Sequence, residues 1–198
     1  MSSNDVRKTA RERILDTAEE LFYQEGIRAI GIDTVIERSG VAKMSLYRNF
    51  ASKEELIAAF LARRNEKYWS WWDGIMARHP ESAARQVEDL FVALPERICR
   101  PGYRGCSFLN AATEFPDAGH LGRRAALSHY EELRRRLLAL CRRLKATKPK
   151  QLADQLLLLI EGAYTTGGIL GYRDAVKSVA GAAAELIRSH GTATQRIR

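Results

Sequence analysis

The sequence lacks several features that mark other classes of protein. No apolar run approaches the roughly 20 residues that a membrane-spanning helix needs, since the longest candidate covers only residues 156–160. The first residues, MSSNDVRKTARER, contain no apolar core of the kind found in a cleaved secretion signal. The three cysteines, Cys99, Cys106 and Cys141, form neither a disulfide framework nor a C-x-x-C pair. These absences predict a cytoplasmic protein with reduced thiols and no membrane partner.

Catalytic motifs are also missing from the sequence. The chain has no P-loop, no G-x-G-x-x-G, no H-E-x-x-H and no G-x-S-x-G. Its four histidines, His79, His120, His129 and His190, do not have the spacing of metal ligands. We therefore expect a protein that is not an enzyme, and we expect neither a metal nor a cofactor.

The net charge of +8 is distributed unevenly along the chain. Residues 1–66 contain 11 basic and 11 acidic residues, whereas residues 123–150 contain 10 basic and 2 acidic ones. The overall charge is therefore no evidence that the N-terminal part binds nucleic acid. The basic segment 123–150 would either attract an acidic partner or form a solvated helix face, and the sequence leaves both open.

The apolar residues repeat with a helical period along almost the whole chain. A first helix carries Ile14, Leu15, Ala18, Leu21 and Phe22 on one face, and we expect Gly26 to end it in a left-handed cap. A fourth, long helix is expected to follow the S-x-x-E capping box at 52–55. The other helices are predicted at about 32–39, 43–50, 81–98, 105–114, 118–146, 149–171 and 173–190. The prediction is an all-α chain of about nine helices, with a seam near 50–66 and a frayed tail at 191–198.

Two short helices joined by a tight turn at Gly40 indicate a helix-turn-helix motif. In this motif the second helix enters the major groove of DNA, where lysine and arginine donate to guanine O6 and N7. We expect the buried face to be Val35, Val41, Leu46 and Phe50, and the outward face to be Lys43, Met44, Tyr47 and Arg48. Around the outward face, one basic surface would add Arg7, Lys8, Arg11, Arg13 and Lys53. A helical hairpin with a solvated basic face is the alternative that periodicity alone leaves open.

The run GIDTVIERSGVAKMSLYRNFASKEEL resembles the DNA-binding domain of the tetracycline-repressor (TetR) family. The family pattern of Gly-Val followed by L-Y-x-x-F-x-x-K-x-x-L matches Gly40-Val41 and then 46–56, while Ala42 departs from the common Ser/Thr and Asn49 from a frequent His. The resemblance implies a helix-turn-helix domain at 1–55 and a helical effector-binding and dimerisation domain at 56–198. The DNA-contacting positions that it implies are Thr34, Lys43, Met44, Ser45, Tyr47, Arg48, Asn49 and Lys53. Of these, Thr34, Tyr47 and Lys53 would mainly hold phosphates.

The same resemblance implies that the last two helices pair with those of a second subunit. Both predicted helices, 149–171 and 173–190, combine large apolar residues with small ones that allow close helix packing. The alternative is that these two helices pack only within their own chain. The expected dimer contacts are Leu157, Ile160, Gly167, Gly168, Val176, Val179, Ala183 and Leu186.

A ligand cavity is expected between the fourth helix and the helices that follow, because small-molecule sites combine aromatic surface with a few polar groups. We expect Cys106, Asn110 and Thr113 to share one helix face, although aromatic residues at helical spacing also suit an ordinary core. Glu161 lies in an apolar run, where a buried carboxylate needs an arginine, a tyrosine hydroxyl or a cationic ligand as partner; an exposed Glu161 is the alternative. The expected lining residues are Trp69, Trp72, Phe91, Cys106, Leu109, Asn110, Thr113, Glu161, Tyr164 and Thr165.

Together these features predict a homodimeric repressor that binds a pseudo-palindromic double-stranded DNA operator and is released by a small-molecule effector. Activation instead of repression is open, as is a redox or electrophile response of Cys99 or Cys106, next to Arg97, Arg100 and Arg104. The alternative from another class is a helical ligand-binding or protein-interaction module that does not read a specific DNA sequence. The specific-to-non-specific affinity ratio separates the two.

Overall fold

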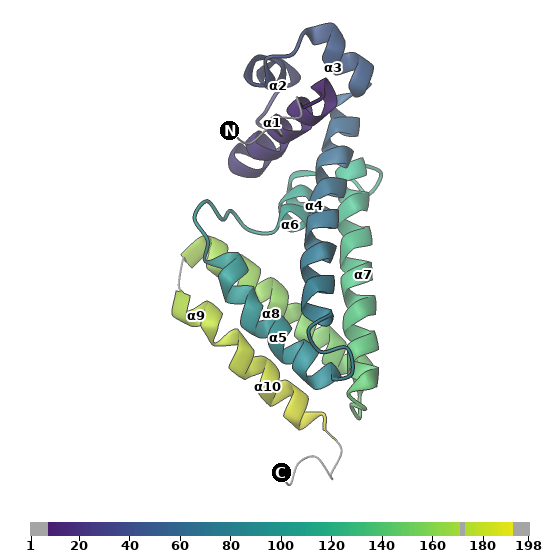
Figure 1. The fold of residues 1–198 in the computed structure, drawn as a ribbon, viewed down its shortest axis with the longest axis vertical. Coiled ribbons are helices and arrows are strands. Elements are labelled where there is room, and N and C mark those ends of the chain that lie inside the picture. The colour runs from purple at the N-terminus through teal and green to yellow at the C-terminus, as the bar shows by residue number, and fades with distance from the viewer. Residues whose placement is uncertain (1–7, 171–172, 192–198) are drawn as a thin grey trace, which may run out of the picture. The chain divides into compact units, whose positions relative to one another are not determined.

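A computed structural model of the protein describes residues 8–170 and 173–191 (Figure 1). Every regular element in these residues is a helix, which confirms the all-α prediction. No helix among them is long and apolar enough to cross a membrane. Arg7, expected in the basic surface, and the expected frayed tail beyond Gly191 lie outside the described residues. The helices are α1 (Ala10–Glu25), α2 (Ile32–Ser39), α3 (Lys43–Asn49), α4 (Lys53–Met76), α5 (Ala83–Ile98), α6 (Ser107–Glu114), α7 (Leu121–Arg143), α8 (Pro149–Leu170), α9 (Arg173–Lys177) and α10 (Val179–Ser189).

Several helix ends differ from the predicted ones for local reasons. The expected last helix is divided at Ser178 into α9 and α10. Helix α6 begins only at Ser107 because Gly105 has φ +88°, which a right-handed helix does not contain. Helix α7 ends at Arg143, before Lys145 with φ +55°. Gly26 ends α1 with φ +98° and ψ 148°, so the expected left-handed cap is wrong there.

The described chain divides into two compact units that are not continuous in sequence. The first contains the chain up to Asn65 together with Ser107–Ala126, and the second contains Glu66–Cys106 and the chain from Leu127 onward. The first unit thus includes α1 to α3, the start of α4, α6 and the start of α7. The predicted functional division into 1–55 and 56–198 differs from these units and stays a prediction.

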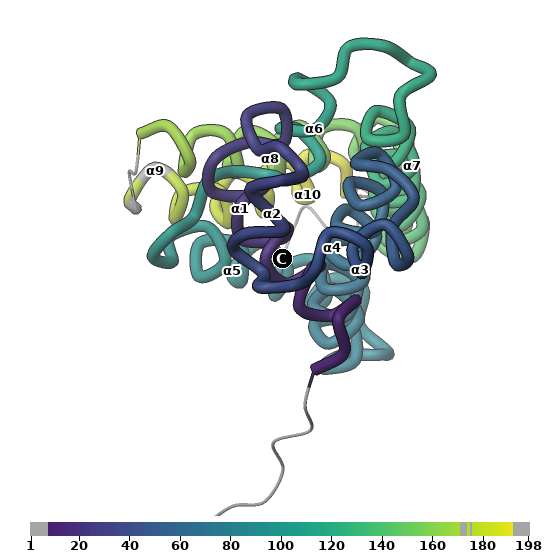
Figure 2. The backbone as a smooth tube through the Cα atoms, turned by 90° about the horizontal axis from the view of Figure 1, so that it is seen from above, coloured from purple at the N-terminus to yellow at the C-terminus, as the bar shows by residue number. Residues whose placement is uncertain are grey.

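The first unit is built on the apolar face of α1. Ile14, Leu15 and Ala18 are buried as the periodicity predicted, and the rings of Phe22 and Phe60 meet edge to face at 5.7 Å. The N-terminus of α1 is closed by a capping box, in which the Thr9 hydroxyl accepts from the Glu12 amide and the Glu12 carboxylate accepts from the Thr9 amide. The path from α1 through α2 to α3 can be followed in Figure 2.

The predicted capping box at residues 52–55 is formed only in part. The Ser52 hydroxyl accepts from the Glu55 amide at 3.1 Å, as a helix N-cap does. The Glu55 carboxylate, however, accepts from the amide of Ala51 at 2.7 Å rather than from that of Ser52. Both contacts still satisfy backbone donors at the start of α4.

The second unit has its own hydrophobic core, to which α4, α5, α7, α8 and α10 contribute. Each buried large side chain there contributes roughly 1.5–3 kcal/mol relative to exposure. Helix α10 packs on both α5 and α8, and these three helices lie side by side in Figure 1. Fully or nearly fully buried members of this core include Trp72, Leu90, Phe91, Leu94, Leu133, Leu137, Leu152, Leu156 and Ile160.

Candidate functional site

The turn between α2 and α3 is fixed by a glycine and by an arginine from α1. Gly40 has φ +64° and ψ 27°, a left-handed conformation that suits glycine, and its N–H donates to the carbonyls of Ile36 and Glu37. Arg13 Nη2 donates to the carbonyl oxygens of Ser39 at 3.0 Å and Gly40 at 2.7 Å. Arg13 is exposed as well as holding the turn, and its place in the expected basic surface stays a prediction.

Helix α3 has one buried and one exposed face, as predicted. Val35, Val41, Leu46 and Phe50 are all buried. On the opposite face Lys43 and Arg48 are exposed, Met44 is 65% exposed and Tyr47 is 41% exposed. An exposed helix face with these side chains has the donors and the apolar surface needed to meet base edges and phosphates.

The other predicted DNA-contacting residues are half-buried, which leaves less of each side chain available to DNA. Asn49 Nδ2 donates to the carbonyl of Ser45 at 2.7 Å, so this amide is used within α3. Ser45, Thr34 and Lys53 are half-buried. Burial lowers the pKa of Lys53, while the nearby Glu114 carboxylate acts in the opposite direction.

The departure at Ala42 from the family pattern has a visible effect on α3. Ala42 is the N-cap of this helix and offers no side-chain hydrogen bond. Lys43, the first residue of the helix, lies 3.5 Å from Asp33 of α2. Both groups of this ion pair are largely exposed, so it stabilises the motif little.

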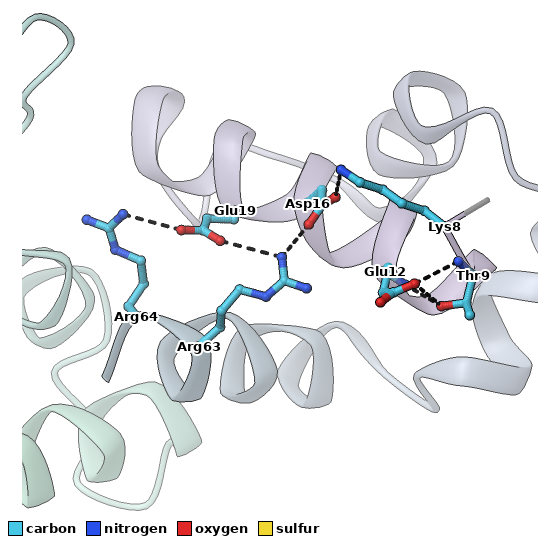
Figure 3. Close-up of polar contacts among 7 residues, drawn as sticks. All are labelled: Lys8, Thr9, Glu12, Asp16, Glu19, Arg63 and Arg64. Atoms are coloured by element: carbon cyan, nitrogen blue, oxygen red, sulfur yellow. Dashed lines mark hydrogen bonds and ion pairs between the residues drawn. The ribbon is translucent and has the colours of Figure 1, made fainter. Parts of the chain in front are cut away.

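Acidic residues of α1 are paired with arginines of α4 (Figure 3). Asp16 pairs with Arg63 and also with Lys8, and Glu19 pairs with Arg64 at 3.3 Å. These pairs account for part of the acidic charge that gives residues 1–66 a net charge of zero. Because each pair also contains a basic residue of the same segment, these pairs do not change that net charge.

A contact that the sequence did not predict joins α6 to the loop after α1. The Glu114 carboxylate, at the end of α6, accepts from the amides of Ile27 at 3.2 Å and Arg28 at 2.7 Å. These residues are 86 and 87 positions apart in the chain, and no local pattern indicates their pairing. Glu114 thus holds the loop that leads into α2.

Comparison with known proteins identifies the family. A family model described as bacterial regulatory proteins, tetR family, matches residues 14–60, which cover α2, α3 and most of α1. The solved structure of SCO4454, a TetR-family transcriptional regulator from Streptomyces coelicolor, is 30% identical with a TM-score of 0.87, over 92% of this chain and 96% of that one. The chain belongs to the TetR family.

Two curated relatives of this TetR-family chain are regulators from Escherichia coli. The HTH-type transcriptional regulator YjdC is 26% identical over 77% of this chain and 80% of its own length. The HTH-type transcriptional repressor ComR is 27% identical over 67% of this chain, and the match spans 64% of ComR. The resemblance drawn from the residues at 31–56 is thereby confirmed, and the exposed face of α3 is the outer face of a TetR-type helix-turn-helix.

The second unit of this TetR-family chain contains an interior polar cluster. We use this name for Tyr68, Arg97, Cys106, Tyr130, Glu161 and Tyr164. Tyr130 Oη donates to Glu161 Oε2 at 2.7 Å and lies 3.6 Å from Cys106 Sγ. A tyrosine hydroxyl is therefore the partner of Glu161, one of the three that the sequence left open. Burial raises the pKa of the Glu161 carboxyl, and the hydrogen bond from Tyr130 partly opposes that rise.

Arg97 joins the aromatic part of this cluster. Its guanidinium carbon lies 5.2 Å from the ring centroid of Tyr68 and 4.7 Å from that of Trp71. Burial raises the pKa of both Tyr68 and Tyr164, and the positive charge of Arg97 opposes this rise at each hydroxyl. Of the six residues, the sequence indicated Cys106, Glu161 and Tyr164 as pocket lining. It missed Tyr68, Arg97 and Tyr130, which come from three different helices.

Of the remaining predicted pocket residues, Trp69 lies beside the cluster, with its ring centroid 4.9 Å from that of Tyr68, and the others are dispersed. Trp69 is half-buried and Trp72 is buried in the core of the second unit. Phe91 lines a different cavity of about 620 Å³ between α5 and α10, and Thr165 is exposed. Leu109, Asn110 and Thr113 lie in the first unit. Because α6 begins at Ser107, Cys106 precedes the helix and does not share its face, contrary to expectation.

Part of the basic segment 123–150 is engaged within the chain. Arg134 pairs with Asp154, and Arg135 pairs with Glu132. Arg136 pairs with Glu132 and Asp73, and its guanidinium carbon lies 4.2 Å from the centroid of Trp69. These contacts engage three of the ten basic residues, and both alternatives for the segment, an acidic partner or a solvated helix face, stay open.

Four of the predicted dimer contacts are already buried within the second unit. Ile160, Val176, Val179 and Ala183 are between 0% and 6% exposed in the single chain, because α8, α9 and α10 pack on α5. They are corrected to core residues, since a buried side chain has no surface left for a partner. Leu157, Gly167 and Leu186 are half-buried, and Gly168 is exposed. A methyl group on Gly167 would lie 2.1 Å from the side chain of Ile98, so this glycine allows close packing inside the unit.

Proposed function

We propose that this TetR-family chain is a homodimeric repressor that binds a pseudo-palindromic operator and leaves it when a small-molecule effector binds. The observation that carries the proposal is the exposed face of α3, presented by a turn that Gly40 and Arg13 hold. In this proposal Arg48, Lys43 and Met44 lie nearest the bases. Tyr47 and Lys53 contact phosphates, which fix the position of the helix on the duplex. The repressor name of the relative ComR supports repression.

The dimer would form through the exposed face of α8. Leu158 is 72% exposed and Ile169 is 76% exposed, and with Gly162 and Thr165 they follow a spacing of four, three and four residues. This spacing places all four on one helix face, with small residues between two large apolar ones. A two-fold dimer presents two copies of α3, as two half-sites on DNA require.

Release from the operator requires an effector that binds the two conformations of the dimer with different affinities. The interior polar cluster is the effector site in this proposal, because it gathers polar groups inside an otherwise apolar unit. The protein acts on DNA, so we expect it to work in the cytoplasm.

The proposal is tested by selecting bound duplexes from a random pool at about physiological salt. An enriched palindrome supports a dimeric regulator. A lack of enrichment, with only salt-sensitive bulk binding, contradicts it and favours the module that does not read a specific sequence.

Variants of the exposed face of α3 then test the roles of single residues. We expect Arg48→Ala to relax the preference at one base position by about 1–3 kcal/mol. Tyr47→Ala should weaken binding to all duplexes alike, because phosphates carry no sequence information. Arg85→Ala, an exposed arginine of α5, is the control. Wild-type competition profiles for both α3 variants would exclude α3 as the reading helix.

A further inference from the structure

Two tyrosine hydroxyls inside the second unit have no acceptor for their proton. Among the described residues, the buried hydroxyl oxygens of Tyr68 and Tyr164 are without one, and each residue is 5% exposed. Buried polar groups are nearly always hydrogen-bonded, so an unpartnered pair in one place indicates that something else completes the bonding. Both hydroxyls belong to the interior polar cluster.

The cluster has more donors than acceptors. Tyr68 and Tyr164 each have a hydroxyl proton to donate, and Arg97 carries a positive charge that acts on both hydroxyls. The acidic group of the cluster is Glu161, which already accepts from Tyr130. A ligand that fits this set supplies acceptor oxygens, and a negative charge on them would balance Arg97.

The surroundings of the two hydroxyls are aromatic. The ring of Tyr164 stacks with that of Tyr103 at 6.4 Å, and the ring of Tyr68 meets that of Trp69 edge to face at 4.9 Å. Arg97, Cys106, Tyr130 and Glu161 are half-buried, so solvent reaches part of each, whereas the two hydroxyls are buried. His129, against Tyr68 and Trp69, is kept neutral by burial and adds no charge.

We propose that the interior polar cluster binds an aromatic carboxylate, whose carboxylate accepts from the hydroxyls of Tyr68 and Tyr164 and faces the guanidinium of Arg97. The aromatic ring of the ligand lies against the surrounding rings. A cationic ligand is disfavoured because Arg97 already occupies the faces of Tyr68 and Trp71. This inference rests on the proposed effector role of the cluster and names the chemical class of the effector.

The first test uses benzoate, benzylamine and benzyl alcohol as probes of the full-length purified protein, with binding followed by calorimetry. We expect benzoate to bind most tightly of the three. Tyr68→Phe and Tyr164→Phe should each weaken benzoate about tenfold or more, as expected for a hydrogen bond to a charged group. Glu161→Gln should make benzoate bind more tightly, since a neighbouring acidic group is lost. Tyr23→Phe, on α1, is the matched control.

Thermal unfolding separates a binding role from a structural one. Because neither hydroxyl donates to an acceptor in the free protein, the Phe variants should melt near the wild-type temperature without ligand. They should lose the rise in melting temperature that benzoate gives the wild type. Preferred binding of benzylamine, no benzoate binding, or unchanged benzoate affinity in both Phe variants would overturn the proposal.

Selection of DNA on the same preparation distinguishes this inference from the proposed function. An enriched palindrome without benzoate binding rejects the ligand class and leaves the regulator in place. Benzoate binding with the expected variant effects, but without an enriched palindrome, supports the site and rejects the proposed regulator.

Discussion

At the scale of single residues, His129 makes the stability of the protein depend on pH. Its side chain is 3% exposed and lies against Tyr68 and Trp69. Burial, with the positive charge of Arg97, lowers its pKa from 6.5 to about 3. Between pH 6.5 and pH 3 His129 is protonated in the unfolded chain but neutral in the folded one. The free energy of unfolding therefore falls as the pH falls below 6.5.

We expect the wild type to lose about 1–2 kcal/mol of unfolding free energy between pH 7 and pH 5 through this residue. Urea unfolding at both pH values measures the loss. His129→Gln lacks the titrating group and should lose correspondingly less over the same interval, while the other titrating groups act on both proteins. Equal losses in the two proteins would show that His129 has the same pKa in the folded chain as in the unfolded one.

At the scale of elements, Glu114 connects α6 to the loop between α1 and α2. Its carboxylate accepts from two backbone amides of that loop, those of Ile27 and Arg28. The loop determines where α2 begins, and α2 packs against α3. A charged acceptor that holds two amides is therefore a means of positioning the reading helix.

Glu114→Ala should lower the unfolding free energy by about 1–3 kcal/mol, because two donors lose a charged acceptor. It should also weaken binding to the selected operator. Chemical denaturation and a titration of labelled duplex measure the two effects. Thr113→Ala is the control from the same helix, since the Thr113 hydroxyl donates to the Leu109 carbonyl within α6. If both variants behave alike, Glu114 has no positioning role.

The sequence predicted those features of the site that depend on local pattern. The buried and exposed faces of α3 follow from the spacing of Val41, Leu46 and Phe50, and the turn follows from Gly40. The contacts of Arg13, Glu114 and Tyr130 could not be assigned, because they join residues between 24 and 87 positions apart. Helical periodicity tells which face of a helix is buried but not which other helix covers it.

At the scale of the whole molecule, the exposed face of α8 determines the expected assembly. Leu158→Glu should shift the protein from a dimer toward the 22.3 kDa monomer in sedimentation velocity, because an unpaired charge would be buried in the interface. The melting temperature should change much less than the assembly, since Leu158 is 72% exposed. Leu127→Glu, at a side chain of α7 that is 57% exposed, is the matched control. A dimeric Leu158→Glu would place the interface elsewhere.

The apolar composition of α8 to α10 could not tell which side chains belong to the core of the chain and which are exposed to a second subunit. Val176 and Ile160 are as apolar as Leu158 and Ile169, but only the latter two are exposed. The difference arises from the way α10 packs on α5 and α8, and the apolar character of each helix does not reveal it.

The discontinuous first unit has a consequence for the exchange of DNA-reading heads between regulators. Ser107–Ala126 belongs to that unit together with the chain up to Asn65. If residues up to Asn65 are replaced by those of another regulator, Glu114 of this chain faces a foreign loop between α1 and α2. If residues up to Asn65 of this chain are moved to another regulator, its loop loses Glu114. Transferring the DNA-binding part of this chain to another regulator therefore requires both segments of the first unit. The alternative is a recipient whose own α6 ends in a carboxylate at the equivalent position.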